Sequence, residues 1–311
     1  MKIPPTRATP SLISKTSRGL ALLAAAAGLA ALLPHARADD ADSRVHALLN
    51  FELADKYLTP RGMIVQDHGA TMQVLFLAFV NVYSGTPGDF INSVTLIPGV
   101  WNDYATSPVA EHLTAGSKGS DWIEIDPILG VEFGVAKNFK LDVTYTEFGM
   151  QILDIGTSQH LETKLGYDDS AALGAFALHP YVSFWRELEG KATAAANFGI
   201  PSSYYFEVGI DPGWSSDGVK YELPIRALLP SANFYGETFA PKSTVALYEV
   251  GLKVSGAAAF VPKGYGHWGW HLGYKYMSFV DDNLKQLSTG GGFATKTNGT
   301  GQVYAGLSSF F

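Results

Sequence analysis

The stretch NFKLDVTYTEF, residues 138–148, decides the fold class of this chain. One side of it is apolar and the other is charged or hydroxylated, because Phe139, Leu141, Val143 and Tyr145 alternate with Lys140, Asp142, Thr144 and Thr146. Successive side chains of a β-strand point to opposite faces. A period of two therefore predicts a strand with one apolar face.

The same alternation recurs along the chain. It is clear in five further stretches, at residues 159–168, 203–212, 219–229, 244–256 and 265–279. The runs reach about 9–11 residues, the length of a tilted strand across a bilayer, whereas ordinary strands average about 5–6. Six less regular stretches lie at 45–57, 69–83, 90–102, 121–135, 174–186 and 300–311. The pattern predicts an all-β fold, a transmembrane antiparallel up-and-down β-barrel of about twelve strands, with ten to fourteen compatible.

The connections between these stretches alternate in length. The longer ones follow every odd-numbered strand, at 58–68, 103–120, 149–158, 187–202, 230–243 and 280–299. An even strand count with long and short connections in turn is typical of outer-membrane barrels, whose short turns face the periplasm.

Composition agrees with this class. The 311 residues include 18 Phe, 15 Tyr, 6 Trp and 33 Gly, and there is no Cys, so no disulfide forms. A run of 18 apolar residues is missing after residue 38, so no spanning helix is expected. A soluble β-sandwich alternates in the same way, so a soluble periplasmic protein remains the outside alternative.

The first 38 residues have the pattern of a cleaved signal peptide. Lys2, Arg7, Lys15 and Arg18 precede an uncharged run at 19–33, and an Ala-x-Ala site ends at Ala38. We therefore expect a single β-barrel domain over residues 39–311. Removing five basic residues and no acids takes the formal charge from −7 to −12, which disfavours a nucleic-acid partner.

The final stretch, GQVYAGLSSFF, carries a resemblance. Phe311 follows Val303, Ala305 and Leu307 at alternate positions, with Ser309 as the departure. In this the chain resembles Gram-negative outer-membrane β-barrels. The resemblance implies a location in the bacterial outer membrane, contacts with its lipid and lipopolysaccharide, and recognition of Phe311 as an assembly signal by the barrel assembly machinery.

A second resemblance covers about twenty residues near the mature N-terminus. In ADKYLTPRGMIVQDHGATMQV, the positions Tyr57, Arg61, Gly62, Asp67 and Gly69 resemble the opening hairpin of TorF-type porins. This likeness implies a porin-like channel and names no solute.

The polar faces of the strands would line the lumen of such a barrel. Charged groups are costly in hydrocarbon, so they require a wet or paired interior. The candidates are Glu52, Glu124, Asp126, Glu132, Lys140, Asp142, Glu162, Lys164, Glu207, Lys220, Glu222, Arg226, Glu249, Lys253, His267, His271 and Lys275. Nine acids against six Lys and Arg predict a weak preference for cations.

Two states of the interior remain open. It forms a narrow pore for small hydrophilic solutes, or it is filled. Filling would come from cross-strand pairs such as Glu162/Lys164, Lys220/Glu222 and Glu249/Lys253. A loop folded inward, at 103–120 or 280–299, would do the same.

The sequence predicts no enzyme, no cofactor and no metal site. Ser158 and His160 share a face, but a surface pair at a loop edge is the favoured interpretation. Glu124 and Asp126 are spaced to hold a cation or act as an acid/base pair, although a lumen charge pair is favoured. His267 and His271 are about 13 Å apart on a strand, too far to share a metal directly.

The function predicted first is passive diffusion of small hydrophilic solutes through an outer-membrane porin-like channel. The alternatives are a barrel enzyme acting on lipid or lipopolysaccharide and a closed structural or adhesion barrel. The oligomeric state is left open.

Overall fold

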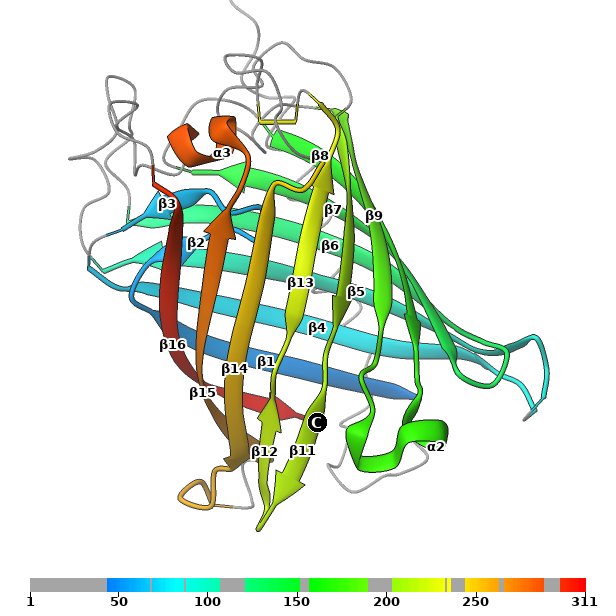
Figure 1. Cartoon of the computed structure of the whole chain (residues 1–311). Helices are drawn as coiled ribbons and strands as arrows, with labels where there is room; N and C mark the ends of the chain where they lie inside the picture. Colours follow the sequence, from blue (N-terminus) through cyan, green and yellow to red (C-terminus); the bar gives the residue numbers. More distant parts are fainter. Residues whose placement is uncertain are drawn as a thin grey trace, which may run out of the picture. The chain divides into compact units, whose positions relative to one another are not determined.

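The chain folds into a closed antiparallel β-barrel, shown in the computed structural model of Figure 1. The structure describes residues 44–67, 69–86, 88–106, 121–151, 157–189, 203–232, 234–235, 244–262, 266–287 and 297–311. The predicted signal peptide, residues 1–38, lies outside the described residues. Within the described part, no helix is long and apolar enough to cross a membrane.

The wall of the barrel has twelve positions, each filled by one long strand or by two short strands in line, and we call each of them a stave. Every stave pairs with its neighbours in the chain. Ten are single strands and two are each split into two shorter strands. The wall runs β1 (Val45–Ala54), β4 (Thr71–Ser84), β5 (Ile91–Ala105), β6 (Trp122–Val135), β7 (Phe139–Met150), β8 (Thr157–Tyr167), β9 (Tyr181–Glu189), β10 (Tyr204–Ile210) with β11 (Gly213–Ser216), β12 (Val219–Glu222) with β13 (Ile225–Pro230), β14 (Leu247–Ala257), β15 (His267–Phe279) and β16 (Gly299–Phe310). The predicted twelve-strand up-and-down barrel is confirmed.

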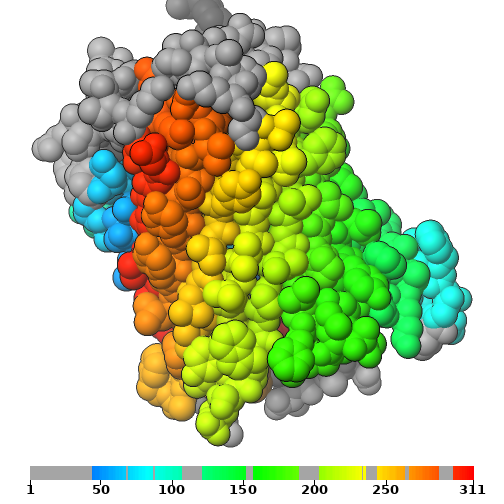
Figure 2. Space-filling model, in the orientation of Figure 1, coloured from blue at the N-terminus to red at the C-terminus, as the bar shows by residue number. Residues whose placement is uncertain are grey.

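The first and last staves close the ring. Leu48 of β1 stands opposite Phe310 of β16, and Ala54 stands opposite Tyr304. Beyond the last strand, Ala47 and Phe311 exchange backbone hydrogen bonds of 2.6 and 3.0 Å. In Figure 2 the blue N-terminal strand and the red C-terminal strand accordingly lie side by side. A closed ring leaves no unpaired edge.

Two staves are interrupted by proline. Pro212 lies between β10 and β11 and Pro224 between β12 and β13, because proline lacks the N–H that a ladder needs. The carbonyl oxygens are still used, since Pro212 accepts from Leu223 at 2.9 Å and Pro224 accepts from Gly251 at 2.8 Å. Asp217 and Gly218, both at positive φ, make the two-residue turn between β11 and β12.

One predicted strand began too early. Residues 174–186 were expected to be a strand, but the segment starts with a 3₁₀ turn η2 (Gly174–Phe176), which follows a short helix α2 (Ser170–Leu173). Both carboxylate oxygens of Asp169 accept from the backbone N–H of Leu178, and Oδ1 also accepts from that of His179. The aspartate thus holds a compact turn, and β9 begins only at Tyr181.

The outer face of the wall is apolar and exposed. Leu53, Leu129 and Leu272 are 55%, 51% and 51% exposed. Also exposed are Phe206, Val208, Tyr248, Val250, Leu252, Tyr274 and Val303. The alternation had placed the seven side chains of this second group on apolar strand faces. Soluble proteins rarely expose large apolar side chains over so continuous a surface.

Aromatic rings mark one end of the barrel, where the short turns and the C-terminus lie (Figure 1). Phe90, Phe176 and Phe260 belong to three of these connections and are 74%, 83% and 71% exposed. Exposed rings at a strand end suit the boundary between lipid and water. We call this end the turn end, and the other the loop end.

A small hairpin leaves the wall after β1. Its strands β2 (Tyr57–Leu58) and β3 (Ile64–Gln66) form a separate two-stranded sheet. A helix, α3 (Asp282–Leu287), follows β15 at the loop end (Figure 1). The predicted inward loop at 103–120 or 280–299 is tested only in part: among the described residues the 55–66 connection turns inward, and Leu284 of α3, within 280–299, is buried in the same interior cluster. Residues 107–120 and 288–296 lie outside the described residues.

Candidate functional site

The hairpin of β2 and β3 occupies the interior at the loop end. We call residues 55–66 the plug hairpin. Tyr57, Leu58, Thr59 and Arg61 are 3–7% exposed, although they belong to a connection rather than to a stave. At its tip Gly62 has a φ of +84°, and a Cβ there would come within 3.0 Å of Leu247 and Phe279. Only glycine fits this turn without strain.

Side chains from elsewhere in the chain hold the backbone of the plug hairpin. Each donates a hydrogen bond to a hairpin carbonyl: Arg226 Nη2 to Pro60 at 2.7 Å, Tyr235 Oη to Arg61 at 2.8 Å, and Gln302 Nε2 to Lys56 at 2.6 Å. The donors lie 166 to 246 residues away in sequence. The hairpin is thus fixed by tertiary contacts rather than by a strand ladder.

Two hairpin side chains reach the wall. The hydroxyl of Tyr57 donates to Oε2 of Glu124 on β6. The guanidinium carbon of Arg61 lies 4.7 Å from the ring centroid of Phe148 and 5.3 Å from that of Trp185. A cation over desolvated rings gains about 0.5–2 kcal/mol. Arg61 is therefore held by the rings that the wall turns inward.

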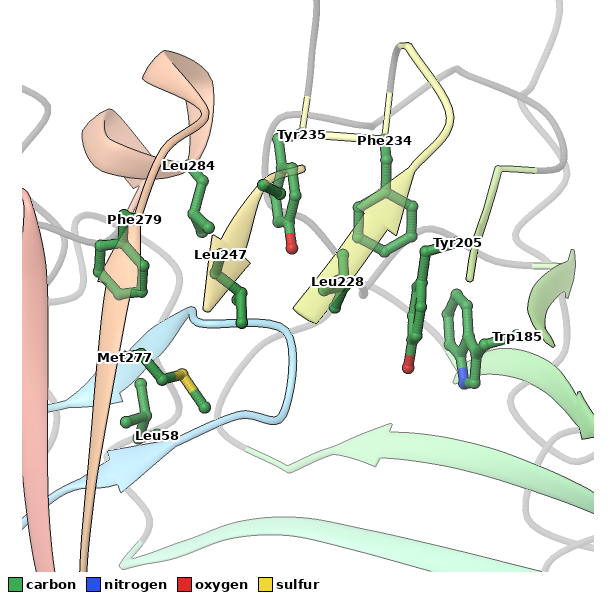
Figure 3. Close-up of a cluster of buried hydrophobic side chains, with 11 residues drawn as sticks. Leu58, Trp185, Tyr205, Leu228, Phe234, Tyr235, Leu247, Met277, Phe279 and Leu284 are labelled. Atoms are coloured by element: carbon green, nitrogen blue, oxygen red, sulfur yellow. The ribbon is translucent and has the colours of Figure 1, made fainter. Parts of the chain in front are cut away.

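An apolar cluster packs beside the hairpin (Figure 3). It joins Leu58 of the hairpin to residues of five staves, of α3 and of the connection after β13. Its buried members are Leu58, Trp185, Tyr205, Leu228, Phe234, Tyr235, Ala246, Leu247, Met277, Phe279 and Leu284. At the loop end, the interior is filled by apolar side chains.

The interior below the hairpin is charged. Arg226 donates to Glu207 through Nη1 and to Glu249 through Nη2, the latter at 2.7 Å. These three side chains are only 10–14% exposed. This guanidinium lies between two carboxylates, and its Nη2 also donates to Pro60, so it links three staves to the plug hairpin.

The other lumen candidates lie on the same side of the wall in the strand register. Glu52 lies 3.2 Å from His271, and Lys140 lies 2.6 Å from Glu132. Asp142 stands opposite Glu132 and Lys164, while Lys275 stands opposite Gln302 and His267 opposite Phe310.

Of the three predicted pairs, one forms, although within a strand rather than across strands, and two do not. Lys220 lies 2.8 Å from Glu222 as expected. Glu162, however, accepts from Ser183, while the Lys164 ammonium lies 3.9 Å from the Tyr181 ring centroid. Glu249 pairs with Arg226, and Lys253 pairs with Glu222 at 3.7 Å. The members of all three pairs share a strand, and Glu162, Lys164, Glu249 and Lys253 each contact a residue of a neighbouring strand instead.

Ser158 and His160 are buried rather than at the surface, which corrects the sequence interpretation. Ser158 Oγ lies 2.7 Å from His160 Nε2 and donates to Glu187 at 3.4 Å. Ser203 donates to the other oxygen of Glu187 at 2.7 Å. Ser158, His160 and Glu187 are at most 1% exposed, and the Phe148 and Trp185 rings flank the imidazole. No solvent-exposed nucleophile results from this arrangement.

A cavity of about 260 Å³ opens toward the turn end, well away from the plug hairpin. Its lining mixes charges with rings: Arg44, His46, Phe79, Asn81, Thr95, Glu132 and Phe310. Of these, only Glu132 was among the lumen candidates. Arg44, His46 and Asn81 lie near strand ends, where the alternation is hardest to phase.

Sequence reasoning also missed Asp103, Glu187 and Tyr235 as interior residues. Asp103 shares the inward face with Trp101, but it lies just beyond the predicted strand at 90–102 and was assigned to the connection that follows. Tyr57 and Arg61 were singled out only through a resemblance, because nothing local shows that their segment turns inward.

Neither a protein-family model nor a curated protein matches this chain. Among solved structures, it is similar to the NanC porin, with 8% identity and a TM-score of 0.45 over 84% of this chain and 98% of that one. It is similar to the β-domain of the Bordetella autotransporter BrkA, with 12% identity and a TM-score of 0.46 over 86% and 100%. An outer-membrane channel from Pseudomonas putida F1 gives 10% identity and a TM-score of 0.43 over 86% and 95%.

The chain's own strand pairing carries the assignment. A closed antiparallel barrel with an apolar exterior, a charged interior and exposed rings at one end has the architecture of a bacterial outer-membrane β-barrel.

Proposed function

We propose that this protein is an outer-membrane channel for small hydrophilic solutes whose loop-end mouth is closed by the plug hairpin. The observation that carries the proposal is the division of the interior. A charged lining and a cavity of about 260 Å³ lie beyond a hairpin that belongs to a separate sheet. Polar lining is what a hydrated path requires.

The hairpin is built to move as a unit. Its contacts with other segments are side-chain hydrogen bonds and ring contacts, each worth about 0.5–2 kcal/mol net, together with the packing of Leu58 and one backbone bond from the Asp55 N–H to the Val303 carbonyl at 3.1 Å. Its removal would leave every wall ladder intact, because β1 already pairs with β4 from Val45 to Ala54. Displacing the plug hairpin would therefore break these local contacts and leave the strand pairing of the barrel intact.

The open path should weakly prefer cations. The lumen candidates include nine acids and six Lys or Arg, and Asp103 adds a further buried carboxylate. An excess of one sign raises the local concentration of counter-ions in a low-dielectric passage.

Planar-bilayer recording of the refolded chain tests this function. Ala54 stands opposite Thr71, so a short Asn-Gly turn can replace residues 55–70 without changing the β1–β4 ladder. We expect rare, brief openings for the unaltered chain, steady conductance for the replaced one, and a cation-directed reversal potential in a KCl gradient. Replacing Asp217–Gly218 with Asn-Gly at the turn end is the matched control and should leave conductance unchanged.

A closed structural or adhesion barrel is the second candidate. The apolar cluster that fills the loop end favours it. If neither the unaltered chain nor the hairpin-replaced chain conducts at any voltage, the channel proposal is wrong and this second candidate stands.

We also propose that the assembly machinery recognises β16 through Phe311. The exposed faces of Val303 and Phe311 fit a strand whose outer side meets lipid. Phe311→Ala should slow insertion into the outer membrane without changing the conductance of the protein that does insert.

A further inference from the structure

The cavity at the turn end has a row of hydrogen-bonding side chains across three neighbouring staves. Asn81 of β4 stands opposite Thr95 of β5, and the Asn81 N–H donates to the carbonyl of Arg44, just before β1, at 2.7 Å. All three residues line the cavity. We call Arg44, Asn81 and Thr95 the donor row. Across the next ladder Thr95 stands opposite Glu132, which completes the polar part of this lining.

A row of rings lies beside the donor row, deeper in the barrel. His46 of β1 stands opposite Phe79 of β4, two residues from Arg44 and from Asn81 respectively. The ring of Phe310 closes the group, with centroids 5.5 Å from that of His46 and 6.0 Å from that of Phe79. Two residues along a strand span about 6–7 Å. The cavity therefore offers polar and apolar contacts one small molecule apart.

The donor row has hydrogen bonds to give. In the part of the chain that the structure describes, the side chains of Arg44 and Thr95 have no hydrogen-bond or ion-pair partner. Oδ1 of Asn81 accepts from Ser84 at 3.1 Å, which leaves both Nδ2 hydrogens for a ligand. The row thus lacks an acceptor rather than a donor.

The charge of the lining favours the same kind of ligand. Glu132 is the one acid among the seven lining residues, and Lys140 already holds it at 2.6 Å. The guanidinium of Arg44 has no such partner among the described residues. The excess of acids among the lumen candidates lies elsewhere on the wall. A negatively charged group is therefore favoured at this cavity, and a cation is not.

We propose that the cavity binds a small organic carboxylate, with its carboxylate on Arg44 and its apolar body against Phe79 and Phe310. A guanidinium holds a carboxylate through two parallel hydrogen bonds, and Asn81 and Thr95 add neutral donors. An inorganic anion would leave the rings without a partner. The volume of about 260 Å³ is below that of pockets for drug-sized ligands, so the ligand is small.

This site names a class of solute for the proposed channel and rests on that function for the route that the solute takes. Binding itself needs only the wall of the barrel. The site and the channel can therefore be tested separately.

Benzoate is the probe, and saturation-transfer NMR on the whole chain, refolded in detergent, measures its binding. Benzyl alcohol and benzylammonium keep the ring and replace the carboxylate by a neutral or a positive group. Benzoate should bind saturably and about tenfold or more tightly than either of them, because hydrogen bonds to charged groups are the strong ones.

Two variants separate the two rows. Arg44→Gln should weaken benzoate binding about tenfold or more and leave benzyl alcohol binding unchanged, because it removes the charge and no ring. Phe79→Leu should weaken both ligands about two- to tenfold, because it removes a ring and no charge. Arg44→Lys keeps the charge without the planar fork and should fall between Arg44→Gln and the unaltered chain.

Arg186→Gln is the matched control, since Arg186 is an exposed arginine on the outer face of β9. It should leave benzoate binding unchanged. Folding of each variant is checked by its resistance to unfolding in detergent before heating. The Arg44 side chain is exposed and its link to Asn81 is through the backbone, so Arg44→Gln should pass this check.

The proposal is overturned if benzylammonium binds as tightly as benzoate, or if folded Arg44→Gln binds benzoate as the unaltered chain does. It is equally overturned if Arg186→Gln is the variant that loses binding. A chain that binds benzoate as expected and never conducts keeps the site and loses the channel. A chain that conducts and fails the benzoate tests keeps the channel and loses the site.

Discussion

The guanidinium of Arg61, at the plug hairpin, lies against the ring of Trp185 on β9, with 5.3 Å between the guanidinium carbon and the ring centroid. This contact and the one to Phe148 join the hairpin to two inward-facing rings of the wall. A single substitution of Arg61 removes both of these contacts between the hairpin and the wall.

Arg61→Ala should raise the open probability of the channel. The loss of about 0.5–2 kcal/mol of cation–π attraction shifts a closed–open equilibrium by roughly two- to thirty-fold. Arg61→Lys keeps the charge but not the planar stacking, so it should fall between the two. Single-channel recording measures this, with outward-facing Arg186→Ala as control. An Arg61→Ala protein as quiet as the unaltered one, beside a conducting hairpin replacement, would contradict the role given to Arg61.

Arg226→Met should destabilise the barrel by about 3–5 kcal/mol, because it leaves Glu207 and Glu249 buried without their cation. Denaturant unfolding in detergent checks the value. Adding Glu207→Gln and Glu249→Gln should restore most of the loss, since the uncompensated charges disappear. Lys140→Met, which breaks an exposed pair with Glu132, should cost about 1 kcal/mol or less. If Arg226→Met and Lys140→Met lowered the free energy of unfolding equally, the buried ion pairs of Arg226 would contribute no more to stability than the exposed pair of Lys140.

The Ser158–His160 pair should not behave as a catalytic nucleophile and base. Its members are at most 1% exposed, so no acyl substrate reaches the hydroxyl. A fluorophosphonate probe should leave the folded protein unlabelled. Labelling that vanishes in Ser158→Ala, together with turnover of labelled lipid A or phospholipid, would instead establish the enzyme alternative.

The turn before β9 should loosen in acid. Backbone donation from His179, and then from Leu178, holds the pKa of Asp169 below its ordinary value of 3.8. A depressed pKa stabilises the fold above that ordinary value, and the stabilisation is lost as the pH falls through the lower folded pKa. Amide exchange at Leu178 and His179 should therefore accelerate below about pH 4. In Asp169→Asn, the amides of Leu178 and His179 should exchange fast at all pH values. If exchange in this variant still accelerates below about pH 4, a group other than Asp169 causes the acceleration.

The staves were predictable because their signal is local. Phe139 to Tyr145 and Tyr248 to Val254 alternate strictly, and each observed strand there begins or ends within a few residues of its predicted bound. Stretches with apolar residues on both faces gave weaker phasing. In β9, Val182 and Phe184 face outward while Trp185 faces inward. Since both faces carry large apolar residues, the sequence alternation does not show that Trp185 belongs to the interior cluster.

The plug hairpin was not predictable because its position depends on distant partners. Glu124, Arg226 and Gln302 lie 67, 166 and 246 residues from the hairpin residues that they bind. Nothing within residues 55–66 shows which of several connections will turn inward. Asp103 was missed because it lies just beyond the predicted strand at 90–102.

The pairing of β1 with β16 has a consequence for how the molecule fails. Among the described strands of the wall, all but β11, which pairs with β12 alone, have a ladder on both sides, so they cannot fray without breaking two rows of backbone bonds in a solvent that offers no replacement. The wall should therefore melt as one cooperative unit. A mutation that prevents the last stave, β16, from pairing would leave β1 and β15 each with an unpaired edge. The stability of the whole barrel therefore depends on the contact between the two ends of the chain.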